Sequence, residues 1–431
     1  MATYSCRSRE ALRMEAKKLM DRYENLKHEG LKLDMSRGKP SKLQLDLVSD
    51  LLTVLTDPAE CIIDGVDSRN YGDLAGLPCA REYWADVLGC KPSQTFVGGN
   101  ASLHLMHGLI AWGYTHGLKD SPRPWCKEDR IKFLCPSPGY DRHFRITESF
   151  GFELITVPMT PDGPDMDVVE ELVQDPSVKG IWCVPKFSNP QGYTYSDETV
   201  HRFAELKPAA PDFVIMWDNA YCVHEFEGEF QPFEDIISLC AAAGRPNMVF
   251  EFASTSKITF PGAGISVMAS SEENIAYMEK LISAQTISYD KINQLRHVRF
   301  LKDRAHTVEL MKRHATIMAP KFHMVLHMLR AELTNKGIAH WHHPTGGYFV
   351  CVAAMPGTAK RTLELCRRAG VKLTEAGATY PYGVDPLDSY IRIAPSLPPI
   401  EELEKAMEVF CVSLKLAALE KFLGMTFTEL E

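Results

Sequence analysis

The stretch "ASTSKITFPGAG", residues 253–264, holds one lysine between an apolar run and a proline–glycine turn. Lys257 follows the apolar run "MVFEF" and three small hydroxyl residues, Ser254, Thr255 and Ser256. The simplest interpretation is a strand that ends in a polar loop with a solvated lysine. The alternative is an amine held at the end of a buried strand for chemistry. The residues on either side of this stretch decide between the two.

Short apolar runs alternate with helical patterns from about residue 95 to residue 270. This alternation predicts a mostly parallel sheet covered by helices. The predicted strands are "QTFVGG", "RIKFLCP", "FELITVPM", "VKGIWCVP", "FVIMWDNAY", "MVFEFAS" and "GISVMAS".

The two ends of the chain predict a smaller unit. Apolar residues at helical spacing between Leu12 and Leu26 predict an opening helix, with Ser8 as its cap and Gly30 at its end. A short helix is expected near 45–56, a long helical region over 271–335, strands near "AHWHHPTGGYFVCV", "RAGVKLTEAG" and "SYIRIAPS", and a last helix from "PPIEELEKAM". We expect an arm and part of the small domain in 1–50, a large domain in 51–300 and the small domain in 301–431.

Composition excludes several classes of protein. The chain has 431 residues, 45% of them hydrophobic, and a net charge of −9 without a basic block, which argues against nucleic-acid binding. Its 12 cysteines show no metal or redox spacing, so we expect a reduced, cytoplasmic protein. We find no signal peptide and no apolar run of membrane-spanning length. The histidines of "HWHHP" (His340, His342, His343) lack a second ligand set, so no metal site is predicted.

Polar motifs follow two further strands. Asn189, in "SNPQG", comes after "IWCVPKF", and Asp218 and Tyr221, in "DNAY", come after "FVIMW". The carboxyl ends of parallel strands share one sheet edge, where ligands bind, so these side chains are expected to meet Lys257 there. A carboxylate after five apolar residues needs a partner, because an unpaired buried charge is costly. The alternative role for Asp218 is a helix N-cap.

The segment "FVGGNASLHLMHGL" has the pattern of a phosphate-binding turn between a strand and a helix. Two glycines follow a strand, and Asn-Ala-Ser then opens a helical pattern. Such a turn exposes backbone N–H groups at a helix N-terminus, which suits a phosphate. Many strand-to-helix turns share this pattern, so it gains weight only beside the other motifs.

In this order the motifs resemble fold-type I pyridoxal-phosphate (PLP) enzymes of the class I aminotransferase superfamily, over nearly the whole chain. The lysine stretch is similar to the divergent bacterial branch of aspartate aminotransferases that reads "STSK-x-TFPGAG". The resemblance implies an α/β fold, with a mostly parallel seven-stranded sheet in a large PLP-binding domain and a smaller α+β domain formed by both chain ends. It also implies pyridoxal 5'-phosphate as cofactor, an amino acid and a 2-oxo acid as substrates, and a homodimer without nucleic-acid or membrane partners.

The resemblance also implies roles for single residues. Lys257 would form the Schiff base with the cofactor and move the substrate α-proton. Asp218 would keep the pyridinium nitrogen protonated. The other expected roles are Asn189 and Tyr221 on the 3'-oxygen, Tyr140 stacked on the ring, Ala101, Ser102, Ser254 and Ser256 on the phosphate, and Tyr71 on the phosphate of the neighbouring subunit.

Substrate recognition is implied for three positions. Arg392, in "YIRIAPS", would clamp the α-carboxylate through its two-pronged donor geometry, and Gly38, in "SRGKPS", would lie over the substrate. The alternative for Arg392 is a surface strand arginine. An acidic substrate, aspartate or glutamate, needs a second cation, and we expect Arg37 in this role; Lys39 and Arg142 are the other candidates.

The sequence departs from the family in one respect. The family commonly has a phosphate-binding arginine a few residues after the lysine, whereas "ITFPGAGIS" has no cation. Hydroxyls, backbone amides and a helix dipole, or a cation from elsewhere, would then hold the phosphate.

Other functions remain open at this stage. They are a fold-type I aminotransferase of another substrate range, a lyase, an inactive scaffold and a PLP-binding regulator. The scaffold is disfavoured because Lys257, Asp218 and Arg392 are all present. A regulator needs a DNA-binding domain ahead of this region, and only 35 residues precede "SRGKP".

Overall fold

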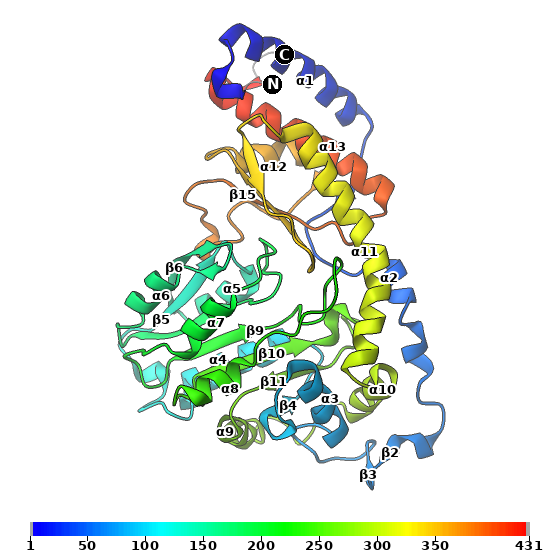
Figure 1. Ribbon diagram of the computed structural model, residues 1–431, viewed down its shortest axis with the longest axis vertical. Coiled ribbons are helices and arrows are strands. Elements are labelled where there is room, and N and C mark those ends of the chain that lie inside the picture. Colours follow the sequence, from blue (N-terminus) through cyan, green and yellow to red (C-terminus); the bar gives the residue numbers. More distant parts are fainter. Residues whose placement is uncertain (1–2, 428–431) are drawn as a thin grey trace.

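A computed structural model describes residues 3–427 and divides them into a sheet-centred part and a part built from both chain ends (Figure 1). The large sheet has the order β4-β11-β10-β9-β8-β5-β6-β7. Strands β10, β9, β8, β5 and β6 run parallel, and β11 runs antiparallel to both of its neighbours. The bounds are β4 (Thr95–Val97), β5 (Lys132–Ser137), β6 (Glu153–Thr160), β7 (Gly163–Pro164), β8 (Val178–Cys183), β9 (Val214–Asp218), β10 (Val249–Ser254) and β11 (Ser266–Ala269).

The mostly parallel sheet and its seven predicted strands are confirmed. The eighth strand, β7, was not predicted. It is a two-residue antiparallel partner of β6, and a pair of residues such as Gly163 and Pro164 carries no alternation of apolar and polar side chains.

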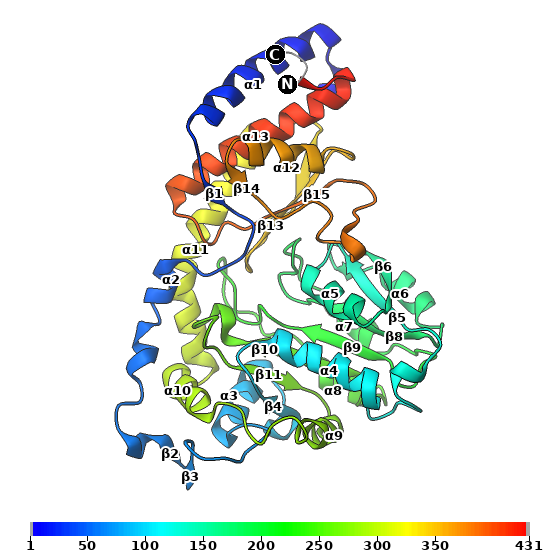
Figure 2. The same cartoon turned by 180° about the vertical axis from the view of Figure 1, so that it is seen from behind.

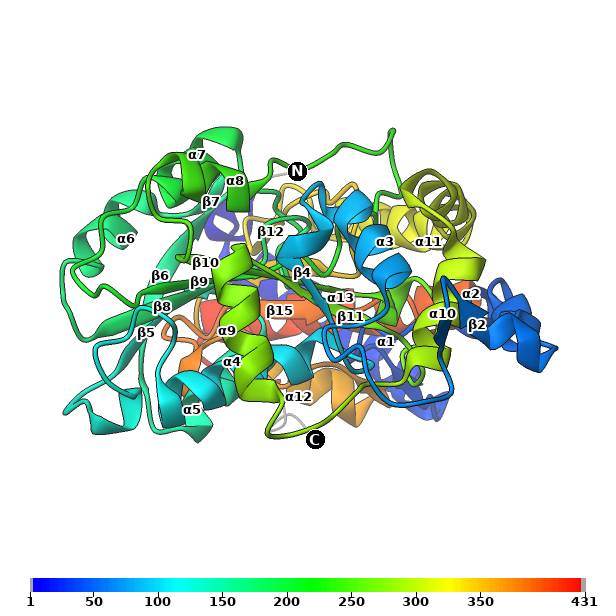
Figure 3. The same cartoon turned by 90° about the horizontal axis from the view of Figure 1, so that it is seen from below.

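Helices cover both faces of the sheet (Figure 3). Strand β9 shows why both faces must be covered, because Val214 and Met216 pack into one apolar cluster and Ile215 and Trp217 into the other. The first cluster includes residues of α4 (Ser102–His116), α5 (Asp141–Ser149) and α9 (Glu272–Ile282); the second includes residues of α3 (Pro78–Leu88), α6 (Met166–Leu172), α7 (Asp197–Ala204), α8 (Ile236–Ala242) and α10 (Lys291–Leu301).

The second part joins the two ends of the chain, which lie side by side (Figure 2). The opening helix is confirmed as α1 (Arg9–His28), and the Ser8 side chain caps it by accepting from the Ala11 N–H at 3.2 Å. Helix α1 packs on α13 (Ile400–Leu423), and β1 (Leu33–Asp34) pairs in parallel with β14 (Val371–Lys372). The remaining elements here are α11 (Arg304–Leu333), β12 (Ala339–Trp341), β13 (Val350–Ala354), α12 (Ala359–Arg368) and β15 (Tyr390–Ile393).

The segment before the sheet differs from the prediction. The helix expected near 45–56 is divided into α2 (Lys42–Asp46) and a 3₁₀ helix (Ser49–Thr53), and the two short strands β2 (Ile62–Ile63) and β3 (Val66–Asp67) follow. Val48 lies between the two helical pieces, where it is buried and has non-helical backbone angles that interrupt the helix. Among the described residues, no helix is long and apolar enough to cross a bilayer.

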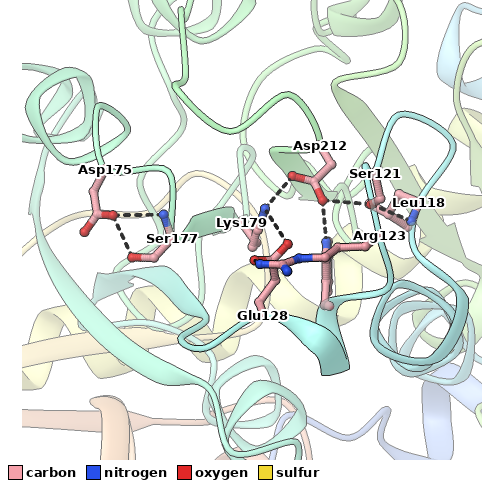
Figure 4. A network of polar contacts seen from close by, with 9 residues as sticks. Leu118, Ser121, Arg123, Glu128, Asp175, Ser177, Lys179 and Asp212 are labelled. Carbon is pink, nitrogen blue, oxygen red and sulfur yellow. Dashed lines mark hydrogen bonds and ion pairs between the residues drawn. The ribbon is translucent and has the colours of Figure 1, made fainter.

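A buried, hydrogen-bonded ion pair lies at the edge of the sheet where strands β8 and β9 begin (Figure 4). The Asp212 carboxylate lies just before β9 and accepts from Lys179 Nζ, Ser121 Oγ and Trp125 Nε1, each at 2.8 Å. Both carboxylate oxygens are therefore satisfied, which a buried ion pair requires. A small cavity of about 310 Å³ lies beside Asp212 at this edge, and a larger one lies at the opposite edge of the sheet.

Candidate active site

A cavity of about 630 Å³ lies at the carboxyl edge of the parallel strands. It brings together side chains from both parts of the molecule. Of the residues singled out in the sequence, its lining includes Arg37, Gly38, Ala101, Ser102, Tyr140, Asn189, Asp218, Tyr221, Ser254, Ser256, Lys257 and Arg392.

Lys257 ends a single 3₁₀ turn, Thr255–Lys257, that directly follows β10. The Thr255 hydroxyl accepts from the Ile265 N–H at 3.0 Å, which folds the "PGAG" turn back under the lysine. Lys257 Nζ lies 5.0 Å from the ring centroid of Tyr221 and 5.9 Å from that of Tyr348. Burial lowers the pKa of Lys257 below its ordinary value, and the Asp218 carboxylate opposes this shift. A larger share of the amine is therefore neutral at a given pH than for a solvated lysine.

Asp218 is the last residue of β9, and only one of its two carboxylate oxygens has a hydrogen-bond partner within the described range of the chain. His143 Nε2 lies 2.9 Å from Oδ2, whereas Oδ1 is buried with no hydrogen-bond partner among the described residues. The His143 ring stacks on Trp182 with centroids 4.4 Å apart. The alternative role as a helix N-cap is wrong, because Asp218 lies in the strand and Asp235 caps the next helix.

Two tyrosines and an amide border the space beside Asp218. Burial raises the pKa of Tyr221 well above its ordinary value, and burial together with the Asp218 charge raises the pKa of Tyr140 to about 12. Both phenols therefore keep their protons at neutral pH and can donate hydrogen bonds. Asn189 is buried, and its Oδ1 accepts from Arg392 Nη1 at 3.1 Å.

The N-terminus of α4 lines one side of the cavity. Ala101 is its N-cap, and no side chain within residues 3–427 caps the helix, so the first N–H groups are available to an anion. Ser254 Oγ donates to Ser256 Oγ at 3.0 Å on the facing turn. The hydroxyls and the helix N-terminus therefore offer hydrogen-bond donors to an anion.

Arg392 enters the cavity from β15 and is only 7% exposed, so the alternative of a surface arginine is wrong. Its guanidinium lies 4.8 Å from the Phe349 ring centroid. Nη1 donates to Asn189 Oδ1 and to Asp141 Oδ1 at 3.2 Å, and Nη2 donates to Thr374 Oγ1 at 3.2 Å.

The remaining predicted residues lie differently. Gly38 lines the cavity where a Cβ atom would meet the Phe349 ring at 2.7 Å, so a larger residue would require that ring to shift. Arg37, Lys39 and Arg142 line the cavity mouth as exposed cations. Tyr71 is 77% exposed and is absent from the lining of this cavity.

Sequence reasoning missed four residues of the site. They come from three separate parts of the chain, and each supports a predicted residue. His143 and Asp141 belong to the segment "PSPGYDRHF", residues 136–144, where a histidine three residues after Tyr140 on the buried side of a helix was a usable signal. The other two are Thr374 and Phe349, whose contacts with Arg392 depend on the pairing of distant strands.

Comparisons with known proteins agree with this geometry. The family described as "Aspartate amino-transferase" matches residues 7–426. An aspartate aminotransferase of Corynebacterium glutamicum is 47% identical over 401 residues, covering 93% of each chain. The crystal structure of an aspartate transaminase from the same species superposes with a TM-score of 0.94 at 46% identity, covering 96% of this chain and 97% of that one.

A more distant structure shares the fold. It is LysN, an α-aminoadipate aminotransferase of Thermus thermophilus, solved with N-(5'-phosphopyridoxyl)-L-leucine; it superposes with a TM-score of 0.73 at 18% identity, over 91% of this chain and 93% of that one.

The fold and the site therefore define a fold-type I aminotransferase, as the sequence predicted. More narrowly, the chain belongs to the aspartate aminotransferase family.

Proposed function

We propose that this enzyme uses pyridoxal 5'-phosphate to move an amino group between aspartate or glutamate and a 2-oxo acid in a two-stage, ping-pong reaction. One observation carries the cofactor assignment. The buried, unpartnered Asp218 Oδ1 lies in the same cavity as Lys257 and needs a donor, and the protonated ring nitrogen of the cofactor is such a donor. The hydroxyls of Ser254 and Ser256 and the N-terminus of α4 suit its phosphate.

The cofactor, when bound, supplies an aldehyde for the amino group and a ring that accepts the electrons released at the substrate α-carbon. The protein supplies the rest. Lys257 Nζ would take the α-proton and return it one carbon away, and its lowered pKa favours the neutral amine that this needs. Tyr221 and Asn189 would donate to the 3'-oxygen, and Tyr140 would cover the ring face. Arg392 would fix the α-carboxylate so that the α-proton faces Lys257.

The substrate is proposed from charge. Four exposed cations line the mouth of the cavity: Arg37, Lys39, Arg142 and Lys372. A side-chain carboxylate could form a charge-assisted hydrogen bond with one of them, whereas an apolar side chain would gain nothing from these cations. The name of the Corynebacterium relative supports an acidic substrate as well. A lyase would consume the amino acid without equal consumption of the 2-oxo acid, so the stoichiometry separates these two reactions.

A substrate panel tests the proposal. Aspartate and glutamate, with 2-oxoglutarate or oxaloacetate as acceptor, should have higher kcat/KM than alanine, leucine and phenylalanine. Arg37→Ala should reduce kcat/KM for the acidic substrates by about tenfold or more, since a charge-assisted hydrogen bond is lost. Arg130→Ala, a surface arginine paired with Glu153, is the matched control and should leave the panel unchanged. A higher kcat/KM for alanine or phenylalanine would contradict the substrate, and an acidic preference that survives in Arg37→Ala would contradict only the role of Arg37.

The active unit is proposed to be a two-fold dimer in which Tyr71 reaches the phosphate of the neighbouring site. Its 77% exposure and its absence from the cavity of its own chain support this role. Tyr71→Phe is expected to weaken cofactor binding about tenfold or more, as expected for loss of a hydrogen bond to a charged group. Equilibrium dialysis measures the affinity, and Tyr114→Phe, on α4, is the control. A fully active monomer at nanomolar concentration, or unchanged affinity in Tyr71→Phe, would be incompatible with shared sites.

A further inference from the structure

The guanidinium of Arg392 is already engaged by a carboxylate of its own chain. Arginine has five N–H donors, two of them on Nη1. Both Nη1 donors are used, one by Asn189 Oδ1 at 3.1 Å and the other by Asp141 Oδ1 at 3.2 Å. One donor of Nη2 goes to Thr374, and Nε is buried with no partner in the described part of the chain.

Asp141 is held in this position by the backbone on its N-terminal side. It is the first residue of α5, on the large sheet, whereas Arg392 belongs to β15 of the other part. The Gly139 N–H donates to the Thr379 carbonyl at 2.7 Å across the same junction. A Cβ atom at position 139 would lie 2.4 Å from the Pro136 carbonyl oxygen, so the turn that presents Asp141 requires glycine.

A ligand carboxylate can replace Asp141 in its contact with Arg392. The Asp141 side chain is 30% exposed, and besides Arg392 it has one charged neighbour among the residues that the structure describes, the mostly exposed Arg142 at 3.9 Å. A substrate carboxylate that binds Arg392 end-on needs one donor from each of Nη1 and Nη2. It must therefore take a donor of Nη1 from Asp141, since Asn189 is more deeply buried.

We propose that Asp141 is a specificity-determining residue that competes with the substrate α-carboxylate for Arg392. The inference rests on the proposed function of Arg392. A ligand with one carboxylate must displace the Asp141 side chain from Arg392 and then bind next to its negative charge. In a ligand with two carboxylates, the negative charge of Asp141 repels both of them, so the affinity for that ligand is reduced further. Asp141 thus lowers the affinity of the site for every carboxylate ligand, and lowers it more for a dicarboxylate than for a monocarboxylate.

Asp141→Asn tests the competition, because the amide keeps the Oδ1 acceptor and loses the charge. The probes are propionate and succinate, which carry one and two carboxylates and have no amino group to transfer. Isothermal titration calorimetry on the holoenzyme should show about tenfold tighter binding of succinate and a smaller gain for propionate. KM for aspartate should fall in parallel, with a smaller change in kcat.

Two further variants complete the experiment. Glu148→Gln removes a carboxylate from the same helix outside the cavity, and its affinities should equal those of the wild type. Asp141→Ser removes the charge with another side chain suited to a helix start, and it should reproduce the gain if Asp141→Asn folds poorly. Unchanged or weaker succinate binding in a folded Asp141 variant would overturn the inference, since Asp141 would then only support Arg392. Calorimetry needs no turnover, so this outcome is distinct from failure of the wild type to transaminate aspartate.

Discussion

Lys257→Ala is expected to have no measurable transamination activity. The substitution removes the amine that would hold the cofactor and also the group that would carry the α-proton. Loss of a positioned general base alone costs about 10²–10⁴-fold. The measurement is steady-state turnover of aspartate with 2-oxoglutarate by the purified, folded variant.

Two controls separate chemistry from folding in this experiment. Lys302→Ala removes a lysine after α10, outside the cavity, and should retain activity. Bound cofactor in Lys257→Ala should be removable by dialysis after denaturation and borohydride treatment, whereas the wild type should retain it covalently. Normal turnover by Lys257→Ala would exclude Lys257 as the catalytic amine.

Asp218→Asn is expected to lower kcat by several orders of magnitude with the fold intact. The amide would keep the size of the side chain and a contact with His143. However, it could not hold a proton on the ring nitrogen of the cofactor, so the ring would accept electrons poorly. The measurements are kcat and the thermal midpoint of unfolding, with the cofactor spectrum as a readout independent of turnover.

A small effect would contradict this role for Asp218. A decrease of less than about tenfold, roughly 1.4 kcal/mol of barrier, would make Asp218 a structural residue. Asp167→Asn, an exposed carboxylate of α6 paired with Arg202, is the matched surface control and should leave kcat unchanged.

The sheet and most of the predicted site were accessible from the sequence because their signals are local. Each strand is a short apolar run, and each polar side chain follows such a run directly. Parallel strands bring these ends to one edge. Lys257, Asp218 and Asn189 therefore meet in one cavity, as predicted.

The contacts around Arg392 were not accessible in this way. Asp141 and Thr374 reach it from segments far apart in the chain, and no local pattern encodes such a meeting. The contact between His143 and Asp218 was only partly accessible from the sequence. His143 lies beside two predicted residues, Tyr140 and Arg142, but its contact with Asp218 depends on how α5 packs on the sheet. The short strand β7 and the division of the helix near 45–56 were missed because segments of two to five residues carry too little periodicity.

The joining of the two chain ends has a consequence for synthesis on the ribosome. The Tyr23 hydroxyl donates to the Leu365 carbonyl, 342 residues later, so α1 emerges long before the surface that it packs on. At roughly 5–20 residues per second the apolar side of α1 waits about 20–70 s for its partners. The sheet-centred part can form during this interval, whereas the nascent N-terminal helix stays exposed. We therefore expect this helix to be the segment that chaperones most often protect.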